Sequence, residues 1–393
     1  MAHVRQLALV LALLAALIEV SPAQVKTPKP APAAKPVPAA KAAAAPPSSA
    51  RASQDLLDGV DAADLKAAKA ALARKADPNA RDEHGVTALM MACEDDRNLA
   101  LVRLLLDSGA DPNAHDMVGF TALMTAAASD NDEILKLLLE RKADPNARDV
   151  NGWTALTTAA AEHHPDAAQL LLAAAADYNA TDKHGTTVLM LASAAGEAEI
   201  VQSLLDAARA PAASPSAPPG PSKPPLNLMA RDYNGWTALH HAVSYDRAEV
   251  ARLLLAAGAD PNTPSRSQLT PLMLAAAGNH LATAQVLADN GAKVDARGPN
   301  GLTALMLAAG AGDAEMVLLL LAHGADPNAR TAGGRTSLMD AAFHGDKEVV
   351  EALLAKGADP NARTTAGDSV LARASARSGN DAVVALLKQA GAK

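Results

Sequence analysis

Histidine and cysteine are the side chains of this 393-residue chain best suited to acid–base, nucleophilic or metal chemistry. The eleven histidines include two adjacent pairs, His163-His164 and His240-His241, but none has a second ligand four residues away in a known metal motif. The single cysteine, Cys93, excludes an internal disulfide and a Cys-x-x-Cys metal site. No phosphate loop, Gly-x-Ser-x-Gly turn or His-Glu-x-x-His helix occurs. We expect no enzyme activity, metal or cofactor; catalysis or metal binding through histidine or methionine is the alternative hypothesis.

A second group of side chains that could bind a metal is a stripe of methionines, whose soft thioethers can bind copper(I). Six of them recur at the same place in a repeating pattern: Met90, Met124, Met190, Met273, Met306 and Met339. Adjacent helical repeats lie about 10 Å apart, which is too far for two of these sulfurs to share one ion. We therefore expect the methionines to pack in the core.

The pattern that positions these residues is a pentad, Gly-x-Thr/Ser-x-Leu, which returns mostly every 33 residues. Its glycines are Gly85, Gly119, Gly152, Gly185, Gly235, Gly301, Gly334 and Gly367. One interval of 66 residues contains a variant with Gln268 in place of the glycine, and another interval, of 50, is 17 residues too long. The surplus is Arg209 to Pro225, which has seven prolines, and we expect a surface loop there because proline cannot extend a helix.

Each unit has the apolar spacing of two short antiparallel helices with one shared apolar face, marked in the first full unit by Leu89 and Leu105. The threonine of the pentad can cap the first helix, and a glycine before the recurring Ala-Asp-Pro-Asn suits a left-handed stop to the second. Three units have Lys75, Lys142 or Ala175 instead of that glycine. Each should cost about 1 kcal/mol if the left-handed backbone is kept.

A 33-residue period that carries both Thr-x-Leu-x-x-Ala and Ala-Asp-Pro-Asn resembles the ankyrin repeat. The resemblance covers residues 54–393 and implies an all-α helical repeat solenoid of about ten units with short hairpin-like loops. Nine units have the pentad or its variant, and an amino-terminal cap precedes them. The resemblance also implies a non-catalytic protein that binds a protein partner.

The first 53 residues lack the repeat. Residues 1–23 combine a positively charged start, an apolar run from Leu7 to Ile18 and small residues ending at Ala23, which is typical of a secretory signal peptide. The apolar run is too short to span a bilayer, so we expect cleavage after Ala23 and no membrane span in the mature protein. Residues 24–53 are rich in proline, alanine and lysine and predict a disordered linker. The expected location is a periplasm or the extracellular space.

The formal net charge of −8 makes a nucleic acid an unexpected partner. We expect a protein partner and a monomeric scaffold.

Aromatic residues make up only 2% of the chain, and six of the seven fall on one expected surface. With each unit numbered from its Asp-x-x-Gly turn, the resemblance implies that positions 2, 3, 5, 13, 14 and 33 line the concave face. The six are Phe120, Trp153 and Trp236 at position 5, Tyr233 at position 2, Phe343 at position 13 and Tyr245 at position 14. Exposed aromatic residues on a rigid surface are typical binding anchors. The alternative is that the rings only cover the hairpins.

Position 33 carries a row of arginines on the same face. In the carboxy-terminal half, Arg297, Arg330 and Arg363 are each followed by an uncharged residue, and Arg335 lies nearby in sequence. These four predict a locally unpaired positive stripe that can bind acidic groups. In the earlier units an aspartate follows the arginine and should neutralise it. A solvated hairpin edge is the alternative.

Together these patterns favour an exported, non-catalytic scaffold that binds a partner protein through its concave face. Two settings stay open: a partner in the cell envelope, or a host protein met by a secreted effector.

Overall fold

Ten consecutive pairs of antiparallel helices make up the part of the chain that the computed structural model describes, residues 48–209 and 224–393. The expected signal peptide (1–23), most of the expected linker (24–47) and most of the expected insertion (210–223) lie outside the described residues. Within the described ranges no strand forms, and only isolated bridges join the two arms of a hairpin, as between Arg81 and Thr87. The all-α repeat solenoid predicted from the sequence is confirmed.

The first helices of the pairs are α2 (Ser48–Asp61), α4 (Ala88–Ala92), α6 (Ala122–Ala128), α8 (Ala155–Ala161), α10 (Val188–Ala195), α12 (Ala238–Ser244), α14 (Pro271–Gly278), α16 (Ala304–Ala311), α18 (Ser337–His344) and α20 (Val370–Ser375). The second helices are α3 (Leu65–Ala73), α5 (Leu99–Asp107), α7 (Asp132–Glu140), α9 (Pro165–Ala173), α11 (Ala198–Arg209), α13 (Ala248–Ala256), α15 (Leu281–Asp289), α17 (Ala314–Ala322), α19 (Lys347–Ala355) and α21 (Asp381–Gln389). Two 3-10 turns, η1 (Asp96–Asn98) and η2 (Pro299–Gly301), lie between helices.

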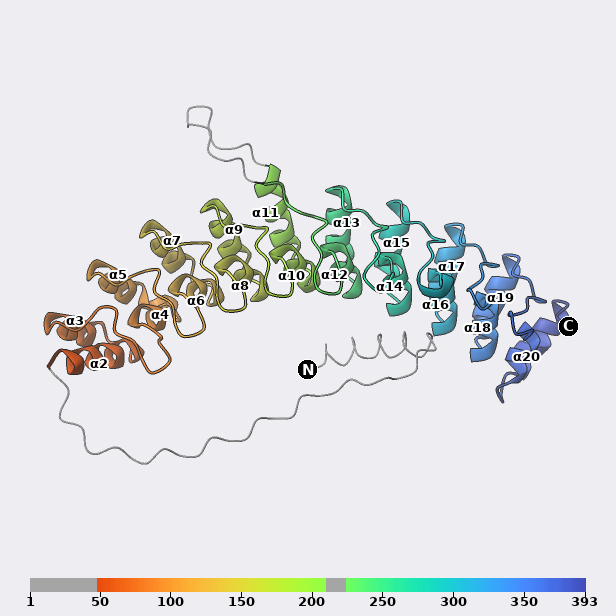
Figure 1. Cartoon of the computed structure of the whole chain (residues 1–393), viewed down its shortest axis with the longest axis horizontal. Helices are drawn as coiled ribbons and strands as arrows, with labels where there is room; N and C mark the ends of the chain where they lie inside the picture. The colour runs from red at the N-terminus through yellow and green to blue at the C-terminus, as the bar shows by residue number, and fades with distance from the viewer. Residues whose placement is uncertain (1–47, 210–223) are drawn as a thin grey trace.

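The pairs stack side by side into an arch (Figure 1). The first helices lie along its inner, concave edge and the second helices along its outer, convex edge. Each helix contacts its counterpart in the next pair, as α6 contacts α8 and α7 contacts α9. One cluster of alanine, leucine and methionine side chains runs through the whole stack, because a single helix pair can bury its remaining apolar face only against a neighbour.

A threonine fixes the start of the first helix in most units, as the sequence predicts. The Thr87 hydroxyl accepts a hydrogen bond from the Met90 amide at 3.2 Å, and such a cap contributes about 1 kcal/mol. The same bond forms at Thr121, Thr154, Thr187, Thr270, Thr303, Thr336 and Ser369. The six methionines of the stripe are at most 3% exposed. Their predicted role in packing is confirmed.

Two kinds of hydrogen bond tie each unit to the next outside the apolar core. In the hairpin bond, the amide at position 2 donates to the carbonyl at position 3 of the preceding hairpin, as from Val150 to Val118 at 2.8 Å. In the asparagine bridge, Asn113 accepts from the Asp144 amide at 2.7 Å and donates to the Lys142 carbonyl at 3.1 Å. Complete asparagine bridges also form at Asn79, Asn179, Asn262, Asn328 and Asn361.

Both ties are interrupted near the middle of the stack. Pro299 occupies the donor position of its hairpin and has no N–H, so it cannot form the hairpin bond. Met229 stands where an asparagine would bridge to Asp260. Two bridge positions further on, beyond the complete bridge at Asn262, Asp295 accepts from the Asp326 amide at 3.0 Å but has no donor for the second bond. Apolar stacking carries a larger share of the cohesion at these junctions.

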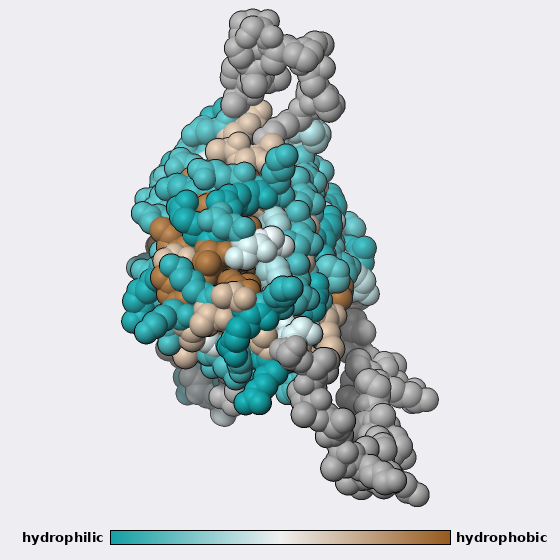
Figure 2. All heavy atoms as spheres, turned by 90° about the vertical axis from the view of Figure 1, so that its left-hand side faces the viewer, coloured by the Kyte–Doolittle hydropathy of each residue, from teal (hydrophilic) through white to brown (hydrophobic). Residues whose placement is uncertain are grey.

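The amino-terminal cap begins earlier than the sequence suggests. The expected linker ends at Ser53, but α2 begins at Ser48 and Ala52 is 2% exposed, so residues 48–53 belong to the folded cap. Alanine-rich composition favoured a linker, yet alanine is also the best helix former, and Ala52 packs one turn before the buried Leu56. Seen from the amino-terminal end of the arch, an apolar area is ringed by hydrophilic side chains (Figure 2).

Both ends of the expected insertion belong to the fold. Arg209 is the last residue of α11. Beyond the insertion, the Tyr178 hydroxyl donates to the Pro224 carbonyl at 2.7 Å and the Asn179 side chain donates to the Pro225 carbonyl at 3.0 Å. Arg209, Pro224 and Pro225, which the sequence pattern assigns to the insertion, therefore have contacts within the repeat stack.

Replacing Lys142 by glycine should stabilise the protein. Lys142 has a φ of 66° at the position where other units have glycine, and an L side chain in this left-handed conformation costs about 1 kcal/mol. We expect Lys142→Gly to raise the free energy of unfolding by up to about 1 kcal/mol in urea titrations. The exposed Lys136 in the middle of α7 is the control: Lys136→Gly should lower it by about 1 kcal/mol. A loss of stability in both variants would contradict this account.

Candidate functional site

Apolar side chains are exposed at the tips of the hairpins that precede α6, α8 and α12. Met117, Val118, Val150 and Tyr233 are between 51 and 73% exposed. Their turns are fixed by an aspartate at position 1, whose carboxylate accepts the amides at positions 3 and 5, as Asp149 does from Asn151 and Trp153 at 2.8 and 2.7 Å. The side chains at positions 2 and 3 therefore stay outside the core and face solvent.

The three rings at position 5 lie at the base of these hairpins and are half-buried. Phe120 and Trp236 pack against the core cluster. Trp236 also stacks on His240, with 6.2 Å between ring centroids, and meets the edge of His241 at 5.3 Å. Trp153 is half-buried in the same way without belonging to that core set. These rings both cover the hairpin and present part of their surface to solvent.

Tyr245 and Phe343 lie at the opposite ends of their first helices. Tyr245 caps the carboxyl end of α12 and is half-buried. Phe343, near the end of α18, is 37% exposed and lies 5.6 Å from the guanidinium of Arg373.

The six predicted aromatic anchors therefore form separate groups. Phe120 and Trp153 belong to adjacent units, and Tyr233, Trp236 and Tyr245 share one unit, while Phe343 is three units further on. Their role in binding stays a prediction.

Sequence reasoning missed Met117, Val118 and Val150, because it considered only aromatic side chains as anchors. Their positions in the hairpin carried the necessary signal: positions 2 and 3 lie at the tip in each unit, and an apolar residue there has nothing to pack on within its own unit.

The arginines at position 33 have a structural contact that the sequence did not suggest. Arg297 donates through Nη1 to the Arg330 carbonyl at 2.7 Å, and Arg330 donates to the Arg363 carbonyl at 2.9 Å, each one unit further along. Arg231 makes the same contact with Pro264. In the part of the chain that the structure describes, Arg297, Arg330 and Arg363 make no ion pair. Arg297 and Arg330 tie their hairpins to the next one, whereas Arg363 donates to the Gly367 carbonyl of its own hairpin at 2.9 Å, and all three charges stay uncompensated.

Arg335 corrects the prediction of a wholly unpaired stripe. Its Nε lies 3.2 Å from Oδ1 of Asp340, an aspartate that is only 4% exposed. Asp340 lies five residues later, on the first turn of α18. Its burial could not be predicted from the sequence, because the equivalent residues in other units are uncharged or half-buried.

The histidine and cysteine side chains that could take part in catalysis or metal binding are mostly held in structural contacts. Within the described residues, no three histidine, cysteine, aspartate or glutamate side chains gather into a possible metal site. Cys93 is fully buried, which raises the pKa of its thiol. His240 is fully buried with Nδ1 2.9 Å from the Thr237 hydroxyl, and burial lowers its pKa to about 4. The structure therefore gives Cys93 and His240 places in the core.

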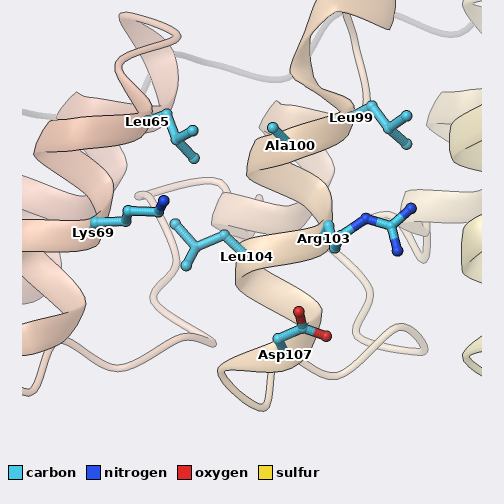
Figure 3. A pocket seen from close by; sticks show the side chains of 7 residues that line it. All are labelled: Leu65, Lys69, Leu99, Ala100, Arg103, Leu104 and Asp107. Carbon is cyan, nitrogen blue, oxygen red and sulfur yellow. The ribbon is translucent and has the colours of Figure 1, made fainter.

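A pocket of about 360 Å³ lies on the convex side between α3 and α5. Leu65 and Lys69 of α3 face Leu104 of α5 across the gap, whereas Arg103 points away from it (Figure 3). The pocket brings no cluster of reactive groups together, so we place the candidate site on the concave face instead.

Comparison with known proteins finds a family match that extends over most of the helix pairs. A family model described as "Ankyrin repeats (3 copies)" matches residues 59–149, 142–216, 222–298 and 272–364, well over half of the chain. A search of curated proteins found no match. None of the helices in residues 48–209 and 224–393 combines the length and apolarity needed to cross a bilayer.

The buried His240 should make the protein sensitive to acid. Because its pKa is about 4 in the folded protein and about 6.5 in an unfolded chain, the unfolded state takes up a proton first and stability falls as the pH drops below 6.5. Six other units have methionine at this position. We expect His240→Met to remove roughly 2 to 3 kcal/mol of the stability lost between pH 7 and pH 4.5, measured by urea unfolding.

The control for this measurement is His84→Met, which replaces an exposed histidine and keeps His240, so it should still lose stability between pH 7 and pH 4.5. Identical pH dependence in parent and His240→Met proteins would show that His240 does not carry the effect.

Proposed function

The chain belongs to the ankyrin repeat family, and on that premise we propose that it is an exported, non-catalytic scaffold that binds a partner protein through the concave face of its solenoid. Ankyrin repeats are in general protein–protein interaction modules. The finer parts of the proposal, namely the face, the export and the single-chain state, rest on the residues described above.

The observation that supports this face most directly is the exposure of apolar hairpin tips in a stack that otherwise buries its apolar residues well. Tyr233 is 70% exposed, with the Arg266 guanidinium 4.9 Å from its ring, and Met117 is 73% exposed. Large apolar side chains next to half-buried rings such as Trp153 are what protein interfaces use as anchors. Burying such side chains in a complex removes them from water and lowers the free energy of the complex. Their exposure in the free protein therefore supports a role in binding.

A metal carrier or an enzyme that uses histidine or methionine receives less support. The six stripe methionines are core residues. Some of the exposed histidines pair with a neighbouring carboxylate, as His163 does with Glu197 at 2.7 Å. In the described residues these side chains stabilise junctions between units and do not converge on a common point.

The proposed location is a periplasm or the extracellular space, supported by the signal-like residues 1–23. A partner in the cell envelope and a host protein met after secretion are both consistent with it. We propose a single-chain scaffold because each unit, including the two caps, finds its stacking partner within the chain.

Removing two anchors should weaken partner binding without unfolding the stack. We propose the double variant Trp153→Ala/Tyr233→Ala, in which neither ring belongs to the core cluster. With a partner isolated on the parent protein from an envelope or host extract, we expect the dissociation constant to rise at least about thirtyfold, because anchor residues typically contribute 2 kcal/mol or more. Biolayer interferometry gives the constant, and circular dichroism checks the helix content.

Leu318 on the convex α17 is a matched control, since it is a large apolar residue with 50% exposure on the opposite face. Leu318→Ala should bind like the parent. Equal loss in both variants, or none in the double variant, would reject the concave face.

The export proposal has its own measurement. Protein recovered from outside the cytoplasm of an expressing bacterium should begin at Gln24, because the apolar run and the small residues ending at Ala23 resemble a cleaved signal. Mass spectrometry of the amino-terminal peptide identifies the start. Exported protein that still begins at Met1 would refute the cleavage.

A further inference from the structure

Two positions in each unit lie together on the concave face: position 5 at the base of the hairpin, and the fourth residue of the first helix. Their proximity is visible in the unit of α12, where they are Trp236 and His241 with rings 5.3 Å apart. In the units of α14 and α16 both positions are leucine, and all four leucines are at most 6% exposed. They are Leu269 and Leu274, then Leu302 and Leu307.

The next unit breaks this pattern with an ion pair. Arg335 and Asp340 occupy the two positions, and Asp340 is 4% exposed. A buried ion pair is often no more stabilising than an apolar pair of similar size, because both charges lose their hydration. The two preceding units show that leucine at both positions is compatible with the same fold. Stacking therefore does not require the charges, and Asp340 is too buried to serve solubility.

The last unit adds a second cation. Arg373 occupies the helix position and Asp368 the hairpin position. Arg373 makes no ion pair within 4 Å among the described residues, and its guanidinium lies 5.6 Å from the Phe343 ring. Together with Arg335, it offsets the burial that raises the pKa of Asp340 to about 6. Nε of Arg335, Nε of Arg373 and Oδ2 of Asp340 are buried without a hydrogen-bond partner in the described structure, so Arg335 and Asp340 form an ion pair without a hydrogen bond.

A pocket of about 480 Å³ opens beside these charges. Arg335, Arg373 and Asp368 line it, and the turns of three successive hairpins complete its wall with Asn300, Gly333 and Ala366. Hairpin tips further back along the stack carry larger side chains, such as Met117 and Tyr233. The small residues at these three tips leave room in front of the two guanidinium groups.

We propose that this pocket binds a carboxylate group of the partner protein between the guanidinium groups of Arg335 and Arg373. The proposal rests on the proposed function only in assigning the carboxylate to a protein; the pocket itself is defined by this chain alone.

The chemistry of the lining supports a carboxylate. Guanidinium groups present planar pairs of N–H donors that match the two oxygens of a carboxylate. Asp340 lies beneath Arg335 and orients it, while Arg373 is the cation without an acidic partner. At the rim, Asp368 is exposed and opposes an incoming anion, so the proposal gives it an effect opposite in sign to that of Arg373.

Peptide titration of the full chain, labelled with 15N on arginine, tests the proposal by nuclear magnetic resonance. The probes are acetyl-Gly-Glu-Gly-amide, its glutamine counterpart, and acetyl-Gly-Gly-Gly with a free carboxyl end. We expect saturable shifts of the Nε–Hε signals of Arg335 and Arg373 with a carboxylate peptide and none with the glutamine peptide. The response to the first or third probe identifies a side chain or a chain end as the source.

Three variants predict whether binding of the carboxylate peptide becomes weaker or stronger. Arg373→Gln should weaken binding of the carboxylate peptide about tenfold, the value of one charge-assisted hydrogen bond. Asp368→Asn should strengthen binding. The double variant Arg335→Leu/Asp340→Leu recreates the leucine pair of the two preceding units, so it should fold with stability equal to or above that of the parent protein and lose binding.

Equal shifts with the glutamate and glutamine peptides, no shift with either carboxylate peptide, or weaker binding in Asp368→Asn would overturn the proposal. Arg373→Gln keeps the test decisive if the double leucine variant does not fold. The Trp153→Ala/Tyr233→Ala protein, altered several units away, should bind the peptide like the parent protein. Failure of the pocket and failure of the wider concave face are thereby distinguishable.

Discussion

Stacking of one helix pair on the next is the interaction on which everything else in this molecule depends. A pair contains fewer than twenty helical residues in most units, too few to form a core of its own. Its first helix is dominated by alanine, leucine and methionine, so neighbouring pairs approach closely over small side chains. The threonine caps, hairpin bonds and asparagine bridges then fix the direction in which the next pair is placed. Cohesion is apolar and shared between neighbours, whereas register is set by polar contacts at the edges.

This division explains where function can reside. Side chains that stack are constrained in size, which is why aromatic residues are nearly absent from the core and Tyr178 is the buried exception. Hairpin tips and position 5 are released from that constraint, because an aspartate or a threonine holds the turn by itself. Residues as different as Trp153, Leu269 and Arg335 occupy the equivalent position, each after a turn whose first side chain (Asp149, Ser265 or Thr331) accepts its amide. The concave face is thus a row of variable side chains on an invariant frame.

Much of the fold was predictable from the sequence, because the 33-residue period repeats the same physical solution. The threonine caps, the buried methionines and the left-handed Lys142 all followed from position within the unit. The start of α2 did not, since alanine is common to linkers and helices alike. For the site, the period located Tyr233 and Trp153 but could not show that Arg297 donates to the next hairpin or that Asp340 is buried beside Arg335. Those contacts depend on the distance between adjacent units and on side-chain reach, which a sequence period does not contain.

The interrupted ties around Met229 and Pro299 have a mechanical consequence. Apolar stacking resists separation of two units but tolerates small rotations, whereas directional hydrogen bonds resist both. We expect rotation to be easiest in the units of α12 to α16, where both kinds of tie are interrupted, and harder in the arm on each side, although in the amino-terminal arm the Asn146 bridge makes only its accepting bond. One arm carries the apolar tips Met117 and Val150, and the other carries Arg335 and Arg373. The two arms can therefore keep their own shape while the distance between them changes to fit a bound partner.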